Sequence, residues 1–232
     1  MIDRPTKSPR SKEKKIEPIT CYVICEGYKD ESKYFEAIES KIRSRYQGNL
    51  VFVPIQRKTT ASAPKKVFEE LDEYFKENDI KIGVRHYNYA FMIIDKDHHF
   101  QDNHREGTLN AIEACKELNV DVLINVPSFE VWEICHYKDI SIENSAYLEQ
   151  LYANRKVSNK KTFSKKEVEL LSNGNRYDNI VENVSAALEN EAKLKLAHPC
   201  NSLPPTKVQS NVGELFKLFE EKGYVIANMF IR

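Results

Sequence analysis

The chain has 232 residues, which is enough for one large domain or for one domain with an appendage. Lys and Arg total 35 and Asp and Glu total 35, so the net charge of zero excludes nucleic-acid binding through overall charge and leaves only local patches for it. No apolar run approaches the roughly 20 residues that a membrane helix needs, and the charged content of 30% is typical of a soluble, helix-rich globular protein.

Residues 1–18 are polar and basic, contain three prolines and show no apolar periodicity, so we predict a disordered tail. A solvated leader is the favoured interpretation, and a weak nonspecific contact with phosphates is the alternative. No apolar stretch typical of a signal peptide follows the basic residues. The cysteines form no C-x-x-C pair, which favours free, buried thiols in a cytoplasmic protein: Cys21, Cys25, Cys115, Cys135 and Cys200.

Residues 19–138 alternate between strand and helix patterns. Helices are predicted at 31–46, from Pro64 onward, and at 107–118, because apolar residues recur there on one face. Short apolar runs predict strands at 20–25, 50–55, 89–94 and 120–126. This order predicts an α/β core with a central parallel sheet flanked by helices on both sides.

After Pro127 the strand patterns almost disappear. We predict a short helix at 129–137 with Ser128 as its N-cap, and a last helix near 212–222. Residues 224–227 are predicted as a short edge strand. Residues 139–232 are therefore predicted to be a mostly helical extension of the same domain.

Carboxylates stand where two of the predicted strands end. Glu26 follows the first strand, and Asp95 and Asp97 follow the third. Because ligands bind open α/β sheets at the carboxyl ends of the strands, these side chains are expected to converge. They would repel one another without a cation between them, and hard oxygen ligands favour Mg²⁺ or Mn²⁺. The alternatives are a solvated turn glutamate and an Asx turn.

Several motifs together resemble the RloB family of Toprim-like proteins over about residues 20–219. They are Ile24-Cys25-Glu26-Gly27, Asp30-Glu31, Tyr34-Phe35, Asp95-Lys96-Asp97-His98, the segment 125–132 with His136, Ala192-Lys193, and Pro205-Thr206-Lys207-Val208. One departure is Val126 before Pro127, where the family pattern has Asn-Pro. The resemblance implies a Toprim-like fold with Glu26 as a metal ligand or proton-handling group and with Asp95 and Asp97 as metal ligands.

The segment from Ser128 to His136 is predicted to belong to the same site. A helical wheel places Val131, Ile134 and Cys135 toward the sheet and leaves a mixed face of aromatic and acidic residues exposed. Glu130 is a candidate metal or ligand contact, and its alternative role is a favourable charge at a helix N-terminus. His136 is a candidate general acid, and a structural histidine is the alternative.

Two further polar segments are candidate substrate contacts. The loop after Asp97 carries His98, His99 and His104, which are weak candidates for a substrate or a transition metal. The segment 155–166 is basic, with an interleaved aromatic, and fits a nucleic-acid backbone with one stacked base, although a solvated charged loop is the alternative. Its candidate contacts are Lys156, Lys160, Lys161, Phe163, Lys165 and Lys166.

These patterns predict a metal-dependent nuclease that cleaves DNA or RNA. The resemblance to Toprim effectors implies tRNA as one possible substrate. The alternative is a noncatalytic Toprim-like module that binds nucleic acid or a partner. The resemblance also implies an effector of bacterial anti-phage defence that works with an ABC-type ATPase encoded nearby. The sequence has no G-x-x-x-x-G-K-[ST] motif, which fits a separate ATPase partner. A homo-oligomer is left open.

Overall fold

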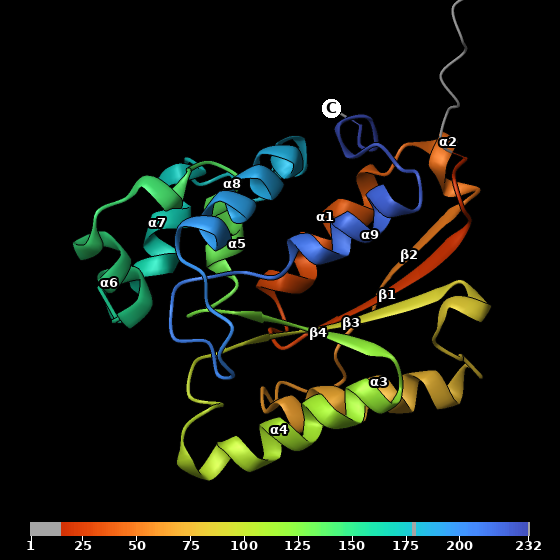
Figure 1. Ribbon diagram of the computed structural model, residues 1–232, viewed down its shortest axis with the longest axis horizontal. Helices are drawn as coiled ribbons and strands as arrows, with labels where there is room; N and C mark the ends of the chain where they lie inside the picture. The colour runs from red at the N-terminus through yellow and green to blue at the C-terminus, as the bar shows by residue number, and fades with distance from the viewer. Residues whose placement is uncertain (1–14, 178–179, 232) are drawn as a thin grey trace, which may run out of the picture.

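The computed structural model describes residues 15–177 and 180–231, and a four-stranded parallel sheet lies at its centre (Figure 1). The strands lie in the order β2-β1-β3-β4, and each pairs in parallel with its neighbour. The two inner strands are buried on both faces, which is why they read as continuous apolar runs. The bounds of the four strands are β1 Ile19–Cys25, β2 Leu50–Pro54, β3 Asn88–Asp95 and β4 Val120–Asn125.

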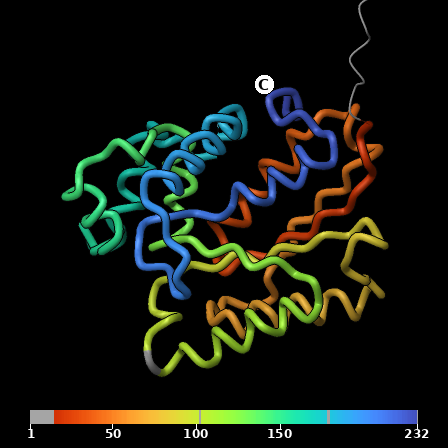
Figure 2. The backbone as a smooth tube through the Cα atoms, viewed as in Figure 1, coloured from red at the N-terminus to blue at the C-terminus, as the bar shows by residue number. Residues whose placement is uncertain are grey.

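Helices cover both faces of the sheet (Figures 1 and 2). Helices α3 (Pro64–Glu77) and α4 (Asp102–Glu117) lie on one face, while α1 (Asp30–Lys41) and α9 (Gly213–Glu221) lie on the other. Alternate residues of β1 accordingly belong to different cores, with Val23 on the side of α1 and Ile24 on the side of α3. The predicted α/β class, with a parallel sheet flanked by helices, is confirmed.

Helices α5 to α8 gather beyond the carboxyl ends of the strands, whereas α2 lies at the opposite end of the sheet (Figure 1). Helix α5 lies under α7 and α8, and all its residues are buried. The predicted helical character after residue 139 is confirmed, and the apolar side chains of α8 continue the core that lies beneath α1 and α9. The bounds are α2 Ser44–Gln47, α5 Glu130–Cys135, α6 Ser145–Ala153, α7 Phe163–Leu171, α8 Val184–Ala197, and short 3-10 helices at Val84–His86, Ile140–Ile142, Ile180–Asn183 and Ile226–Asn228.

Three predicted elements differ from the structure. The helix predicted at 31–46 ends at Lys41, because Ile42 is extended and bridges Phe230. Helix α4 begins ahead of the predicted residue 107, at Asp102. The edge strand predicted at 224–227 is wrong: Tyr224 is buried, its hydroxyl donates to the carbonyl of Glu17, and a 3-10 helix follows.

Only the end of the predicted basic tail falls within the described residues, since residues 1–14 lie outside them. The amide of Glu17 donates to the carbonyl of Lys222, and the two side chains form an ion pair at 3.0 Å. All five cysteines are free, as predicted, but Cys200 is partly exposed where a buried thiol was expected. Within the described part of the chain, no helix combines the length and apolar character needed to cross a bilayer.

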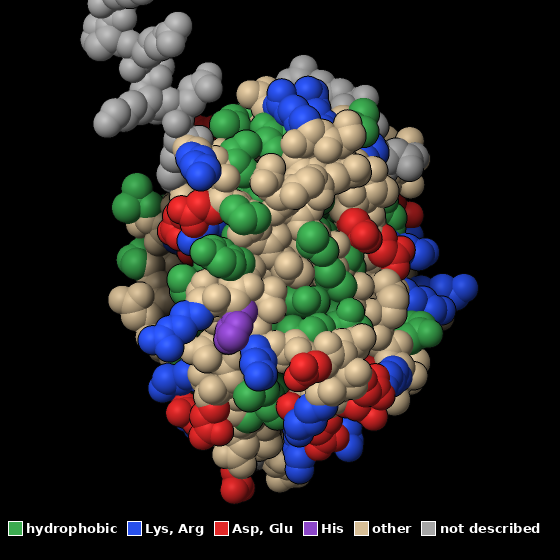
Figure 3. Space-filling view, turned by 90° about the vertical axis from the view of Figure 1, so that its right-hand side faces the viewer, with side chains coloured by type: hydrophobic (Ala, Val, Ile, Leu, Met, Phe, Trp, Pro, Cys, Tyr) green, Lys and Arg blue, Asp and Glu red, His purple; other side chains and the backbone are tan. Residues whose placement is uncertain are grey.

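Figure 3 looks onto the end of the molecule where the strands begin. Hydrophobic side chains are exposed in the middle of this face, and charged side chains of both signs surround them. Tyr87, which directly precedes β3, is exposed. The features that concern function lie at the opposite end, where the strands finish.

Arg57 fixes the loop that carries the first predicted site residue. Its buried guanidinium donates to the carbonyls of Cys25 and Glu26, at 3.2 and 2.9 Å, and pairs with Glu70 at 2.9 Å. We therefore expect Arg57→Met to lower the free energy of unfolding by about 3 kcal/mol, because the buried acceptors lose their donor. Urea denaturation measures this loss. Lys58→Met, which removes exposed ion pairs on the neighbouring residue, is the control and should leave the free energy of unfolding nearly unchanged. Equal losses for the two variants would contradict the role given to Arg57.

Candidate active site

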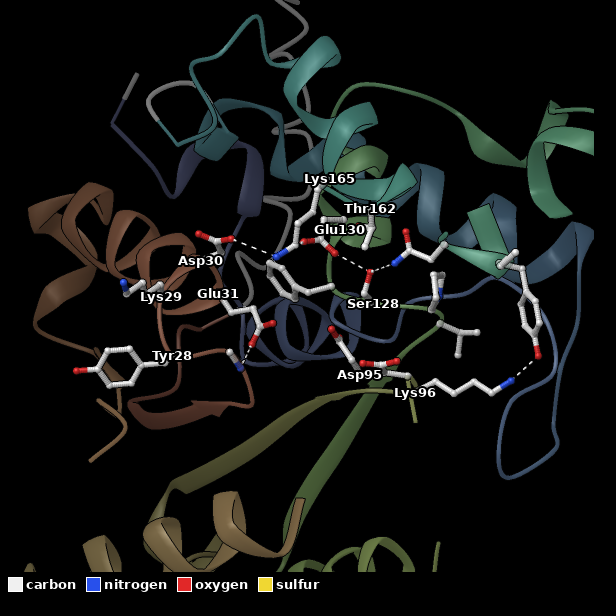
Figure 4. Close-up of a pocket in the computed structure, with 18 of the residues that line it drawn as sticks. Tyr28, Lys29, Asp30, Glu31, Asp95, Lys96, Ser128, Glu130, Thr162 and Lys165 are labelled. Atoms are coloured by element: carbon white, nitrogen blue, oxygen red, sulfur yellow. Dashed lines mark hydrogen bonds and ion pairs between the residues drawn. The ribbon is translucent and has the colours of Figure 1, made fainter. Parts of the chain in front are cut away.

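A cavity of about 840 Å³ opens at the carboxyl ends of the strands (Figure 4). The loops after β1, β3 and β4 form one side of it, and residues of α6 and α7 form another. The charged side chains that line it are Lys29, Asp30, Glu31, Asp95, Lys96, Asp97, Glu130, Lys165 and Arg176. Parallel strands bring these loops to one edge, so residues far apart in the sequence share one space.

Asp95 and Asp97 both line the cavity. Asp95 is the last residue of β3 and stands beside Asn125 of β4. The chain does not stay extended after Asp95, as the sequence prediction assumed. Asp97 has a φ of 25°, and its amide donates to the carbonyl of Pro127 at 3.4 Å. A turn, not the alternation of a strand, therefore brings Asp97 to the cavity.

Glu26 does not line the cavity, although its side chain reaches the backbone of Asp95. Its carboxylate accepts the amide of Asp95 at 3.0 Å and contacts Nε2 of His99 at 2.7 Å. His99 is buried, although its loop was expected to be polar. In this structure Glu26 therefore braces the backbone on which Asp95 stands.

Glu31 supplies a carboxylate that the sequence analysis did not single out as a site residue. It lies in the first turn of α1, faces the cavity, and accepts the amide of Gly27 (Figure 4). A Cβ atom on Gly27 would stand 2.5 Å from the carboxyl carbon of Glu31. Glycine at position 27 thus allows the close approach that holds this carboxylate in place.

The clustered acids disturb one another's ionisation. Loss of solvation, followed by the nearby charges of Glu31, Glu26 and Glu130, raises the pKa of Asp95 well above its ordinary value. Burial and the charge of Glu26 raise the pKa of Glu31 to about 8. The crowded carboxyl groups therefore favour a bound proton, or a cation in its place, near neutral pH.

The acidic side chains of the lining fit a hard divalent cation, because they offer it carboxylate oxygens. Between residues 15 and 231, with 178–179 set aside, no three or more His, Cys, Asp or Glu side chains stand as a ready metal-binding group. A cation would therefore have to draw the carboxylates of Asp95, Asp97 and Glu31 closer together.

Helix α5 departs most from its prediction. Its mixed face was expected to be exposed, but Glu133 and His136 are buried beneath α7 and α8, and Trp132 stacks on Phe216 with ring centroids 5.7 Å apart. Ser128 does not cap the helix through a backbone amide. Its hydroxyl instead donates to the carboxylate of Glu130 at 2.6 Å.

The candidates from this segment are consequently separated. Ser128 and Glu130 line the cavity, whereas His136 lies outside its lining, with Nε2 3.2 Å from the hydroxyl of Tyr34. Burial lowers the pKa of His136 to about 3, so its imidazole is neutral at physiological pH.

Arg176 lines the cavity, and no sequence pattern pointed to it. Its guanidinium contacts Asp30 of α1 at 2.9 Å, Glu133 at 2.7 Å and Glu130 at 3.5 Å. Lys165 lies near the same acids, 3.7 Å from Asp30 and 3.8 Å from Glu130. These two cations join α1 to α5 across one wall of the cavity.

The other members of the predicted basic segment lie outside the cavity lining. Lys161 pairs with Glu169, and Phe163 is half-buried with its ring edge-on to Tyr147, 5.7 Å between centroids. Of the six predicted nucleic-acid contacts, Lys165 alone lines the cavity. The five that do not are Lys156, Lys160, Lys161, Phe163 and Lys166.

The fold and the cavity define an α/β protein with a carboxylate-rich site at the carboxyl edge of a parallel sheet. The chain matches the RloB-like protein family over residues 21–218, which is most of its length, and it belongs to that family. The resemblance seen in the sequence is thereby confirmed. Comparison with curated proteins and with solved structures gave no match.

Proposed function

We propose that this protein is a nuclease that hydrolyses phosphodiester bonds of DNA or RNA with Mg²⁺ or Mn²⁺ as its metal. The observation that supports this function is the cluster of Asp95, Asp97, Glu31 and Glu130 around one cavity, with pKa values raised for Asp95 and Glu31. Asp95, Asp97 and Glu31 are the residues that would hold the ion. A bound divalent ion polarises a phosphodiester and lowers the pKa of a coordinated water.

The chain's own residues then have separable roles. Glu26, held by His99, fixes the backbone of Asp95. Arg176 and Lys165 stand beside the acids, where they can take up the negative charge of a phosphate. Glu31, whose pKa is about 8 in the metal-free protein, would give up its proton near neutral pH when an ion takes that position.

Cleavage assays test this proposal directly. The purified protein is incubated with single-stranded and duplex DNA, RNA and tRNA, each with Mg²⁺, Mn²⁺ or a chelator. Metal-dependent cleavage of at least one of these substrates is expected. No cleavage of any substrate with either metal would reject the nuclease.

A noncatalytic binding module is the second candidate. Arg176 and Lys165 already pair with Asp30, Glu130 and Glu133, which leaves fewer acids free for an ion, and the described residues hold no preformed metal group. Calorimetry with Mn²⁺ separates the two functions. If the protein releases or takes up heat on binding Mn²⁺ and the Asp95→Asn variant does not, the nuclease is supported. If the parent protein shows no heat with Mn²⁺ and cleaves no nucleic acid, the binding module is supported.

The biological setting we propose is bacterial anti-phage defence, with an ABC-type ATPase as partner, in the cytoplasm. It rests on membership of the RloB-like family and on the lack of a phosphate-binding G-x-x-x-x-G-K-[ST] motif in the sequence. The neighbouring genes and co-purification test it. If no ATPase gene lies nearby and no ATPase co-purifies, the partnered form of the proposal fails.

A further inference from the structure

Two exposed tyrosines belong to the lining of the cavity. Among the described residues, three Tyr, Phe or Trp side chains are exposed: Tyr28 at 46%, Tyr87 at 54% and Tyr152 at 37%. Tyr28 and Tyr152 line the cavity, while Tyr87 lies at the other end of β3. An aromatic ring gains free energy when its apolar faces leave water. Because two of the three exposed rings lie at one cavity, they indicate a surface that a ligand can cover.

The two rings stand on opposite sides of the carboxylates. In Figure 4, Tyr28 and Lys96 lie on either side of Glu31 and Asp95. Tyr152 contacts Lys96: its hydroxyl accepts a hydrogen bond from the ammonium group, which also lies 4.5 Å from the centroid of its ring. A chain that crosses the cavity would therefore meet a ring, then the acids, then a second ring.

Cations accompany each ring. Lys29 follows Tyr28 in the chain and Lys96 touches Tyr152, while Arg176 and Lys165 lie on the wall between them. Aromatic side chains that alternate with cations are the means by which proteins hold single-stranded nucleic acid, with bases on the rings and phosphates on the cations. Paired bases in a duplex keep their faces stacked on one another and cannot offer them to both rings.

The size of the cavity agrees with this reading. A volume of about 840 Å³ is within the range of small-ligand sites, roughly 300–1,000 Å³, and so suits a few nucleotides of one strand. We infer that the cavity takes single-stranded nucleic acid, with one unpaired base stacked on Tyr28, another on Tyr152, and the phosphate between them facing Asp95. The position of that phosphate rests on the proposed nuclease function, whereas the stacking does not.

Fluorescence anisotropy tests the stacking without any chemistry. The protein is titrated into labelled 12-nucleotide single-stranded DNA, single-stranded RNA and the matching duplexes, in chelator and without added metal. We expect at least one single strand to bind about 10-fold or more tightly than its duplex. The RNA and DNA arms show which sugar is preferred.

Matched variants assign the effect to the rings. Tyr28→Ala and Tyr152→Ala should each weaken single-strand binding roughly 5- to 100-fold, because each removes one stacked base. Tyr28→Phe and Tyr152→Phe keep the ring and should stay within about 3-fold of the parent. Tyr87→Ala is the control for removing an exposed tyrosine and should leave binding unchanged.

The outcomes separate this inference from the proposed function. Equal affinity for single strands and duplexes, alanine variants that bind like the parent, or no binding to either form would each overturn the inference. Tyrosine-dependent binding in a protein that cleaves nothing would uphold it while rejecting the nuclease. Metal-dependent cleavage of duplex as fast as of single strands would overturn the inference and leave the nuclease standing.

Discussion

Asp95→Asn should lower metal-dependent cleavage by about 1,000-fold while the protein remains folded. Asparagine keeps the shape of the side chain but removes the charge that would hold a divalent ion. The pKa of Asp95 is raised by loss of solvation and by Glu31, so the charged form is unfavourable in the folded protein. We therefore expect the melting temperature of Asp95→Asn to equal or exceed that of the parent at pH 8, since the repulsion is gone.

Asp121→Asn is the matched control for Asp95→Asn. Asp121 stands on the edge strand β4, and loss of solvation raises its pKa, but it lines a different groove from the carboxylate cavity. Its replacement should leave cleavage unchanged. Full activity of Asp95→Asn on the substrate that the parent cuts would remove Asp95 from the mechanism. A strongly lowered melting temperature would instead assign it a structural role.

The stability of the metal-free protein should fall as the pH rises from 5 to 9, and Glu31→Gln should remove much of this dependence. The pKa of Glu31 is about 8 in the folded protein and near 4.5 in an unfolded chain. Below pH 4.5 both states are protonated and the full stability is present. Between pH 4.5 and pH 8 only the folded state keeps the proton, so rising pH favours unfolding. The stability that the protonated Glu31 contributes is lost as the pH passes 8.

The expected loss is on the order of 4 kcal/mol over this range, because each pH unit between 5 and 8 lowers the stability by about 1.4 kcal/mol. Urea denaturation in chelator at a series of pH values measures it. Glu39→Gln changes an exposed glutamate of the same helix and should reproduce the parent's profile. A parent whose stability is constant from pH 5 to 9 would contradict the repulsion among the cavity acids.

The sheet and its carboxylates could be predicted because both depend on local sequence patterns. Apolar runs that are buried on both faces mark inner strands, and the residue after such a strand must stand at the edge of the sheet. This is why Asp95 and Asp97 were expected, and found, beside one cavity. The same reasoning located Glu130, which follows the fourth strand.

The rest depends on contacts between distant parts of the chain, which no local pattern contains. The helical wheel of α5 assumed solvent on one face, but α7 and α8 cover that face and bury Glu133. Arg176 lies in a polar stretch without periodicity, and only the folded chain brings it to Asp30 and Glu133. His99 likewise lies in a polar segment, and its burial against Glu26 is a tertiary contact.

The order in which the walls of the cavity occur along the chain has a consequence for synthesis on the ribosome. The carboxylates of Glu31, Asp95 and Glu130 emerge early, but Arg176 follows much later, and Gln209 pairs with Val126 at the cavity's edge later still. A nascent chain that has exposed every acid therefore still lacks the cation that holds α1 against α5. We therefore expect the binding cavity to form only after the segment that carries Arg176 has folded back onto α1 and α5.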